Sequence, residues 1–247
     1  VASMDRVKQL GRLAENAFAR WATAAEMTNN ASTEDEEGWD YVVEFDLDEE
    51  ESARDPITLD RDLTGLKAFV QVKGTDGTPG YRDLKLSNAR SLIADIPSPS
   101  FLCVVEFDGG TQPQRAFLVH LGREFTANVL ERLRELPMEE QERLHKRHIR
   151  VRYSSADRIE KTGEALREAL LEPVRGDPRA YEQRKSKWLR EVGYEEANAH
   201  FKFQIKPPEG YDGDAVDYIA DFAAGLTSKL EVAGGKAWDV RFGIPQP

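Results

Sequence analysis

The sequence predicts an α/β (α+β) protein, in which helices and strands share one chain of 247 residues. Three observations predict this class. Apolar residues recur every three or four positions over 7–25, they alternate with polar residues over 39–45, and they form a nearly continuous run over 100–107. A chain of this length, with 40% hydrophobic residues, can bury a sizeable core. We expect two domains, residues 1–122 and a mainly helical segment with a few strands over 123–247.

The first half of the chain is expected to begin with a helix over 5–25, because its apolar positions form one stripe. Glu15 lies beside that stripe, among small residues, and is therefore expected to be partly buried. A half-buried strand over 39–45 and a second strand over 65–73 follow. The remaining predicted elements are a short strand over 81–86, a helix capped at Ser87-Asn88 that ends before Pro97, and strands over 100–107 and 116–121.

The second half turns helical and basic from Arg123 onward, and the basic stretch over 143–152 is expected to end in a strand. Helical patterns cover 156–171, 177–199 and 215–226. Alternating residues over 201–205 indicate a strand, and two further strands are expected over 229–232 and 237–244, around Gly234-Gly235.

The net charge of −11 is unevenly distributed along the chain. Residues 1–60 contain 16 acidic and 5 basic residues, whereas residues 61–247 contain 29 of each. The most acidic stretch, residues 34–51, is explained for the most part as solvated loop. The net charge is therefore no argument against a nucleic-acid partner for the rest of the chain.

The single cysteine, Cys103, excludes a disulfide scaffold and a cysteine zinc site, and its apolar neighbours favour a packing role. The sequence contains no signal-peptide pattern and no apolar run of membrane-spanning length. We therefore expect a cytoplasmic protein without a membrane partner.

A polar cluster is expected where the first helix meets the first two predicted strands. Gln71 and Lys73 are two residues apart and project from one face of their strand, and Asp40 stands at the start of the neighbouring one. Glu15 comes from the helix. Such groups are costly to bury unless a cation or mutual pairing compensates them, and their oxygen atoms suit Mg²⁺.

The motif Gly11-x-x-x-Glu15, then Asp40, then Gln71-Val72-Lys73, then a helix and the apolar strand at Phe101, resembles the PD-(D/E)xK nuclease superfamily. It is most similar to the restriction-endonuclease-like domains of bacterial defence proteins that carry a Gln-x-Lys variant. The resemblance covers residues 5–121. It implies a core of a mixed sheet flanked by helices, and hydrolysis of phosphodiesters in double-stranded DNA that depends on Mg²⁺, with Mn²⁺ as a substitute.

The same resemblance assigns roles to four residues. Asp40 is the metal ligand, Gln71 replaces the second acid of the family, Lys73 orients the attacking water and stabilises phosphate charge, and Glu15 completes the metal site. Two departures weaken the match, since Trp39 stands where a proline often precedes the aspartate and Gln71 removes one negative charge from the site. The alternative is a catalytically silent nuclease-fold module that acts in oligomerisation, as a homo-oligomer, or in recruiting a partner protein of a defence system.

Basic residues of the second half are candidates for contacts with the phosphates of duplex DNA. The candidates are Arg143, Lys146, Arg147, Arg150, Arg152, Arg184, Lys185, Lys187 and Arg190. Salt-bridged helix faces explain the same residues equally well, because the neighbouring helices carry many glutamates.

Overall fold

The computed structural model of the chain describes residues 4–32, 38–46, 65–175, 178–194, 199–224, 226, 232–242 and 244–246. It divides into two compact units, Val1–Val192 and Gly193–Pro247. The sequence-based boundary at residue 122 differs from this division, because the helices and strands of 123–192 pack against the sheet of the first unit. The acidic residues 34–37 and 47–51 lie outside the described residues.

The first unit combines five α-helices and eight strands within the described residues. The helices are α1 (Met4–Ala24), α2 (Leu86–Ala94), α3 (Arg123–Glu135), α4 (Gly163–Leu171) and α5 (Pro178–Glu191), with the 3-10 helices η1 (Met138–Lys146), η2 (Ser155–Asp157) and η3 (Glu172–Val174). The strands are β1 (Thr28–Ala31), β2 (Tyr41–Asp46), β3 (Gly65–Thr75), β4 (Tyr81–Lys85), β5 (Ser100–Glu106), β6 (Arg115–His120), β7 (His148–Arg152) and β8 (Arg158–Ile159).

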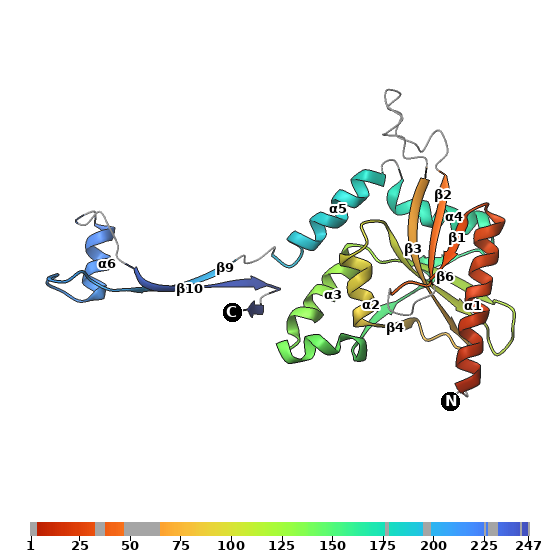
Figure 1. The fold of residues 1–247 in the computed structure, drawn as a ribbon, viewed down its shortest axis with the longest axis horizontal. Coiled ribbons are helices and arrows are strands. Elements are labelled where there is room, and N and C mark those ends of the chain that lie inside the picture. Colours follow the sequence, from red (N-terminus) through yellow and green to blue (C-terminus); the bar gives the residue numbers. More distant parts are fainter. Residues whose placement is uncertain are drawn as a thin grey trace, which may run out of the picture. The chain divides into compact units, whose positions relative to one another are not determined.

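Six of these strands form one mixed sheet in the order β1-β2-β3-β5-β6-β8 (Figure 1). The β3–β5 pair is parallel and the other neighbours are antiparallel. A parallel pair needs a crossover connection, which β4 and α2 provide between β3 and β5. The predicted α+β class with a mixed sheet is thereby confirmed.

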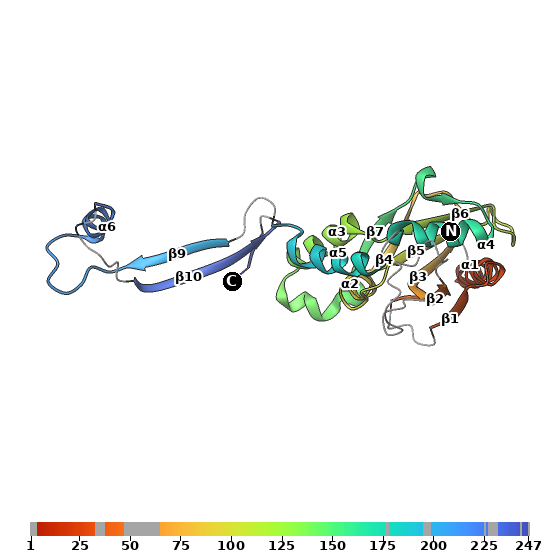
Figure 2. The same cartoon turned by 90° about the horizontal axis from the view of Figure 1, so that it is seen from above.

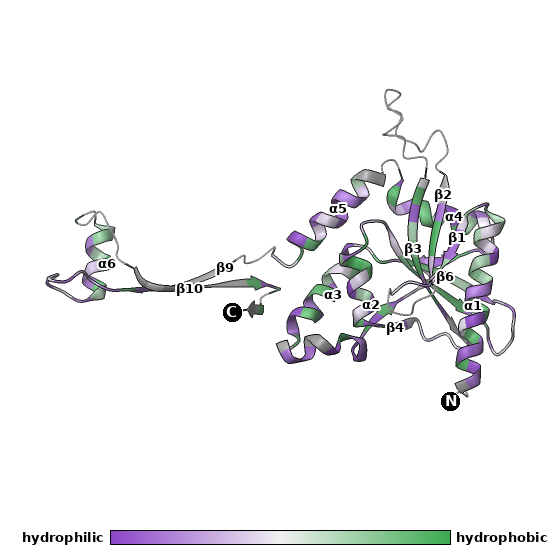
Figure 3. Cartoon of the chain, in the orientation of Figure 1, coloured by the Kyte–Doolittle hydropathy of each residue, from purple (hydrophilic) through white to green (hydrophobic). Residues whose placement is uncertain are grey.

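Both faces of the sheet are covered, and each cover buries its own hydrophobic cluster. On one face, α1 and α4 lie side by side (Figure 2) and pack with the even-numbered residues of β3, such as Val70 and Val72. On the other face, α2, α3 and the separate β4–β7 ribbon pack with Leu102 and Val104 of β5. Figure 3 shows the main strands as largely hydrophobic, which is what strands buried on both faces require.

Most predicted elements of the first unit are found close to their expected bounds. The polar strand β1 was not predicted, because Thr28–Ala31 shows no apolar alternation. Helix α2 begins at Leu86 after Lys85, without a side-chain cap, so the predicted cap at Ser87-Asn88 is wrong. The helix predicted over 156–171 is shorter, because Thr162 caps α4 by accepting a hydrogen bond from the Ala165 backbone N–H at 3.3 Å.

The second unit contains a three-stranded antiparallel sheet and one helix. Its elements are β9 (Ala199–Ile205), α6 (Ala215–Ala223), β10 (Val232–Arg241) and β11 (Ile244–Gln246), with sheet order β11-β10-β9. The helix predicted over 177–199 ends earlier, since α5 stops at Glu191 and β9 begins at Ala199. Gly234 and Gly235 lie within β10 rather than between two strands.

Two further expectations concern the whole chain. Within the described part, no helix combines the length and the apolar character that crossing a membrane requires. Cys103 is fully buried in β5, and burial raises the pKa of its thiol to about 12, which agrees with a packing role.

Candidate functional site

Asp40 is fixed at the start of β2 by its backbone and its carboxylate together. Its N–H donates to the Val70 carbonyl at 3.0 Å, and its own carbonyl accepts from the Ser32 N–H at 2.9 Å. Its Oδ2 accepts a hydrogen bond from the Val72 N–H at 2.6 Å. The carboxylate therefore takes the place of a backbone carbonyl beside β3, and strand pairing sets its position.

Gly38 allows the chain to enter this position. Its backbone has a φ of +85°, which side-chain-bearing residues rarely adopt. A Cβ atom on Gly38 would also lie 2.9 Å from the Cα atom of Asn88 on α2. The close approach to α2 fixes the path of the chain two residues before Asp40.

Gln71 and Lys73 share one face of β3, as their spacing predicts. They lie opposite Leu102 and Val104 of β5, so they project on the side of the sheet that α2 covers. The β2–β3 ladder ends at the pair of Tyr41 with Val70, and the Asp40 N–H donates to the Val70 carbonyl just beyond it. Gln71 is 5% exposed, and its Oε1 has no hydrogen-bond partner among the described residues.

Glu15 reaches the same region from α1, where it is half-buried. Burial raises the pKa of Glu15, the Asp40 carboxylate raises it further, and the charges of Lys73 and Arg12 lower it. These effects require Asp40 and Lys73 to lie within electrostatic range of Glu15. The structure thus brings together side chains of α1, the start of β2 and β3, as the sequence predicts.

The contact between α1 and β3 depends on Gly74. A Cβ atom at this position would lie 2.2 Å from the Leu10 carbonyl oxygen and 3.2 Å from the Ala14 Cβ. Only glycine therefore lets α1 approach β3 this closely. The contact lies one residue after Lys73 on β3 and about one turn before Glu15 on α1. Gly74 positions the helix that carries Glu15 relative to the strand that carries Lys73.

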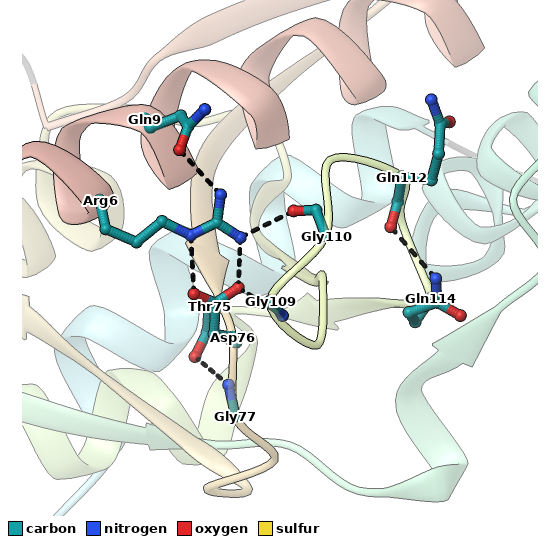
Figure 4. Close-up of polar contacts among 9 residues, drawn as sticks. All are labelled: Arg6, Gln9, Thr75, Asp76, Gly77, Gly109, Gly110, Gln112 and Gln114. Atoms are coloured by element: carbon teal, nitrogen blue, oxygen red, sulfur yellow. Dashed lines mark hydrogen bonds and ion pairs between the residues drawn. The ribbon is translucent and has the colours of Figure 1, made fainter. Parts of the chain in front are cut away.

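An ion pair fixes the same two elements at their ends (Figure 4). The Arg6 guanidinium of α1 donates to both carboxylate oxygens of Asp76, from Nε at 2.8 Å and from Nη2 at 2.6 Å. Asp76 also accepts from the Gly109 N–H at 2.9 Å, and Arg6 donates to the Gly110 carbonyl at 2.7 Å. The hydrogen bond from Arg6 is the main reason that the pKa of Asp76 is lowered.

The donor set of Asp40, Gln71 and Glu15 offers two carboxylates and one amide oxygen. Among the described residues, no group of three or more His, Cys, Asp or Glu side chains is arranged to hold a metal ion. Carboxylate oxygens nevertheless suit a hard cation that keeps part of its water shell, and Asp40 and Glu15 lie within electrostatic range of each other. Asp40, with Glu15 from α1, would therefore hold Mg²⁺, whereas Gln71, whose Oε1 is unpartnered among the described residues, projects to the α2 side of the sheet, away from α1.

Four of the predicted DNA-binding residues lie exposed around η1 and β7. Arg143 and Lys146 lie in the last turn of η1, and Arg152 is the last residue of β7. Arg147 forms an ion pair with Glu140.

Two other candidates are exposed and ion-paired. Arg150 pairs with Asp83 at 3.0 Å. Lys187 pairs with Glu191 at 3.6 Å on α5.

Lys185 is not part of an exposed basic surface, and its prediction as a DNA-binding residue is wrong. It is 1% exposed, and its Nζ donates to the Leu92 and Ser98 carbonyls at 2.8 and 2.9 Å and to the Ser100 hydroxyl at 3.2 Å. Burial lowers the pKa of Lys185 to about 7. Helical spacing marks Lys185 as a buried position, because it lies four residues after the buried Tyr181 and so on the same face of the helix.

Several residues that shape the site were not singled out by the sequence. The Tyr41 hydroxyl donates to the Glu15 carbonyl at 3.4 Å. The alternation of residues in the sequence could have identified Tyr41, because it places this residue on the apolar face of its strand, where it packs against Phe18 of α1. Arg6 and Asp76 are 70 residues apart in sequence, and no local pattern connects them.

Comparison of the chain with protein-family models, with curated protein sequences and with solved structures found no match. A strand-anchored aspartate, a lysine and a helix glutamate lie within electrostatic range of one another in the first unit, and a buried glutamine stands two residues before the lysine on β3.

Proposed function

We propose that the first unit is a Mg²⁺-dependent DNA endonuclease of the PD-(D/E)xK superfamily that acts in bacterial anti-phage defence. The order of its elements supports the assignment, because α1, β1, β2, β3, α2 and β5 follow one another with only β4 inserted. The observation that carries the proposal is the anchoring of the Asp40 carboxylate to the strand that bears Gln71 and Lys73.

The residues suggest how a phosphodiester would be hydrolysed. A bound Mg²⁺ would supply an acidified water molecule and stabilise negative charge in the transition state. The Lys73 ammonium would neutralise a phosphate oxygen and orient the attacking water. Glu15, which lies within electrostatic range of Asp40 and Lys73, would complete the metal site.

A plasmid-nicking assay in Mg²⁺ tests the proposal. We expect Lys73→Ala and Asp40→Asn to lower the rate at least about a hundredfold, because each removes charge at the reacting phosphate. Asp40→Asn is preferred to alanine, since its amide oxygen can still accept from the Val72 N–H. Lys67→Ala is the matched control, because Lys67 lies on the same strand but pairs with Glu44 at 3.0 Å. Equal nicking by all variants would contradict the proposal.

Assembly is a second candidate function, and one observation favours it. Helix α6 and the residues after it expose large apolar side chains, namely Val216, Ile219, Phe222 and Leu226, with exposed fractions between 42% and 77%. Calorimetry separates the two candidates. If the protein binds neither Mg²⁺ nor Mn²⁺ in a manner that depends on Asp40, a non-catalytic role in oligomerisation or partner recruitment is favoured.

A further inference from the structure

Helix α6 of the second unit exposes an apolar face, which we call the α6 face. Val216, Ile219 and Phe222 have exposed fractions of 71%, 42% and 43%, and Ala220 and Ala223 are exposed as well. At about 100° per residue, these five residues cover an arc of about 160° around the helix. An apolar arc of this width is typical of a helix that packs against another element.

A different side of α6 is used within the second unit. Tyr218 is 3% exposed, and its ring packs edge-to-face against that of Tyr211, with the ring centroids 5.1 Å apart. The Tyr211 hydroxyl donates to the Asp221 carboxylate, about one turn after Tyr218. These contacts fix which side of α6 meets its own unit, so the α6 face is left for another surface.

Acidic residues surround the α6 face. Asp217 borders it along the helix, and Glu209, Asp212 and Asp214 precede the N-terminal end of the helix. Residues 207–226 contain five acidic residues and no basic one. Two copies of this surface would bring like charges together, and the phosphates of a nucleic acid or of an anionic membrane would be repelled as well. The charge therefore favours a protein partner that carries basic residues.

We infer that the α6 face docks a segment of another protein, one that presents an apolar stripe flanked by lysine and arginine residues. This inference rests on the second candidate function, assembly, and names the chemistry of its partner. An amphipathic helix fits, because its apolar side chains would cover Val216, Ile219 and Phe222 while its basic residues meet the surrounding acids. The apolar contacts should supply most of the affinity, and the charges should select the partner.

The test is fluorescence anisotropy of the full chain with a fluorescein-labelled amphipathic peptide of leucine and lysine. An analogue with glutamate in place of lysine is the control peptide. We expect the lysine peptide to bind, with an affinity that falls as salt is raised, and the glutamate peptide not to bind.

A variant of the α6 face locates the bound peptide. Ile219→Ser/Phe222→Ser should weaken binding of the lysine peptide at least about tenfold, because it removes apolar contacts and leaves every acidic residue in place. The matched control is Val7→Ser, since Val7 is 60% exposed on α1 of the first unit and its change should alter Kd less than about twofold.

A second variant tests the charges separately. Glu209→Gln/Asp212→Asn removes two exposed carboxylates and leaves the helix cap, which Asp214 and Asp217 form, intact. We expect it to weaken binding of the lysine peptide about threefold and to reduce the dependence of Kd on salt. Far-UV circular dichroism shows that each variant is folded.

Three outcomes overturn the inference. The glutamate peptide binds as tightly as the lysine peptide, or Ile219→Ser/Phe222→Ser binds like Val7→Ser, which means that the peptide binds elsewhere. In the third outcome, light scattering shows a wild-type oligomer that Ile219→Ser/Phe222→Ser makes monomeric, so that a second copy occupies the α6 face and assembly holds without a basic partner. Failure of the wild type to nick plasmid in Mg²⁺ contradicts the nuclease proposal alone, because no part of this test depends on hydrolysis.

Discussion

Gln71 illustrates how a single residue can be unfavourable for stability and useful for binding. An amide oxygen that is buried without a hydrogen-bond partner destabilises a protein by about 1–3 kcal/mol. Asp40 supplies a negative charge at the adjoining edge of β3, where it accepts the Val72 N–H. A cation bound to the Gln71 oxygen would remove the unfavourable burial, and this is why Gln71 is a candidate ligand rather than an ordinary core residue.

Gln71→Glu should restore the second acid of the site. The added negative charge next to Asp40 is expected to tighten Mn²⁺ binding about tenfold, equivalent to about 1.4 kcal/mol, as measured by isothermal titration calorimetry. Without metal, the two carboxylates repel each other, so the variant should also unfold at a lower temperature. Gln183→Glu, at an exposed position of α5, is the control. Unchanged Mn²⁺ affinity in Gln71→Glu would show that this residue does not face the metal.

At the scale of elements, the packing of α1 on β3 decides where the site forms. Gly74 permits the approach, and the Arg6–Asp76 ion pair fixes the ends of both elements. The sequence predicts both elements from their periodicity but does not predict how closely they pack. The distance between a helix and a sheet depends on contacts between residues far apart in the chain, and a glycine in a strand has several explanations.

Gly74→Ala should therefore destabilise the first unit. The added methyl would meet the Leu10 carbonyl at 2.2 Å, so α1 must shift, and we expect a loss of about 3 kcal/mol in urea unfolding. Gly77→Ala is the matched control, because the nearest atom to its Cβ is the Pro79 Cδ at 3.9 Å. Nicking should fall in Gly74→Ala under conditions where the protein is still folded. A variant as stable as the wild type would disprove the close approach.

The packing of α5 on the sheet involves a half-buried histidine, His120, whose neutral form is favoured. The His120 Nε2 of β6 lies 2.8 Å from the Tyr181 hydroxyl of α5. Burial lowers the pKa of His120 to about 4, and the positive charges of Lys185 and Arg184 act in the same direction. Its role at the edge of the core agrees with the sequence, in which it follows three apolar residues.

The lowered pKa of His120 predicts that the stability of the protein depends on pH. Below its ordinary pKa of 6.5, His120 takes up a proton in the unfolded chain but not in the folded one. The free energy of unfolding therefore decreases as the pH is lowered from 6.5 toward 4. At pH 5 the loss is about 2 kcal/mol. His120→Gln lacks this contribution, so the difference in unfolding free energy between pH 7 and pH 5 should be smaller than in the wild type. Equal pH dependence in urea unfolding would contradict the prediction.

For the whole molecule, the sequence predicts the fold class, most elements and the approach of Glu15 to Asp40 and Lys73. It does not predict the boundary between the compact units, because the helices of 123–192 carry basic exposed faces while their buried sides pack on the main sheet. Lys185 shows the reason. The basic residues of α5 include one, Lys185, whose side chain is buried, and only its spacing from the buried Tyr181 distinguishes it from the exposed ones.

The charge distribution also has a meaning for the whole molecule. The acidic excess lies within residues 1–60, which include Glu15 and Asp40. A phosphate that approaches these carboxylates is repelled unless a cation and basic side chains compensate. Lys73 provides one positive charge within range of the Glu15 carboxylate.

The carboxylate of Asp40 has a consequence for how the protein avoids self-association. Within the described residues, β2 pairs with 65–70 of β3 only, so the following residues of β3 present a strand edge on that side. An open strand edge is a template on which another chain can add a strand. By accepting the Val72 N–H, Asp40 blocks that edge with a negative charge. Asp40→Ala would therefore expose this edge to another strand, whereas Asp40→Asn keeps an acceptor for the Val72 N–H and should remain monodisperse.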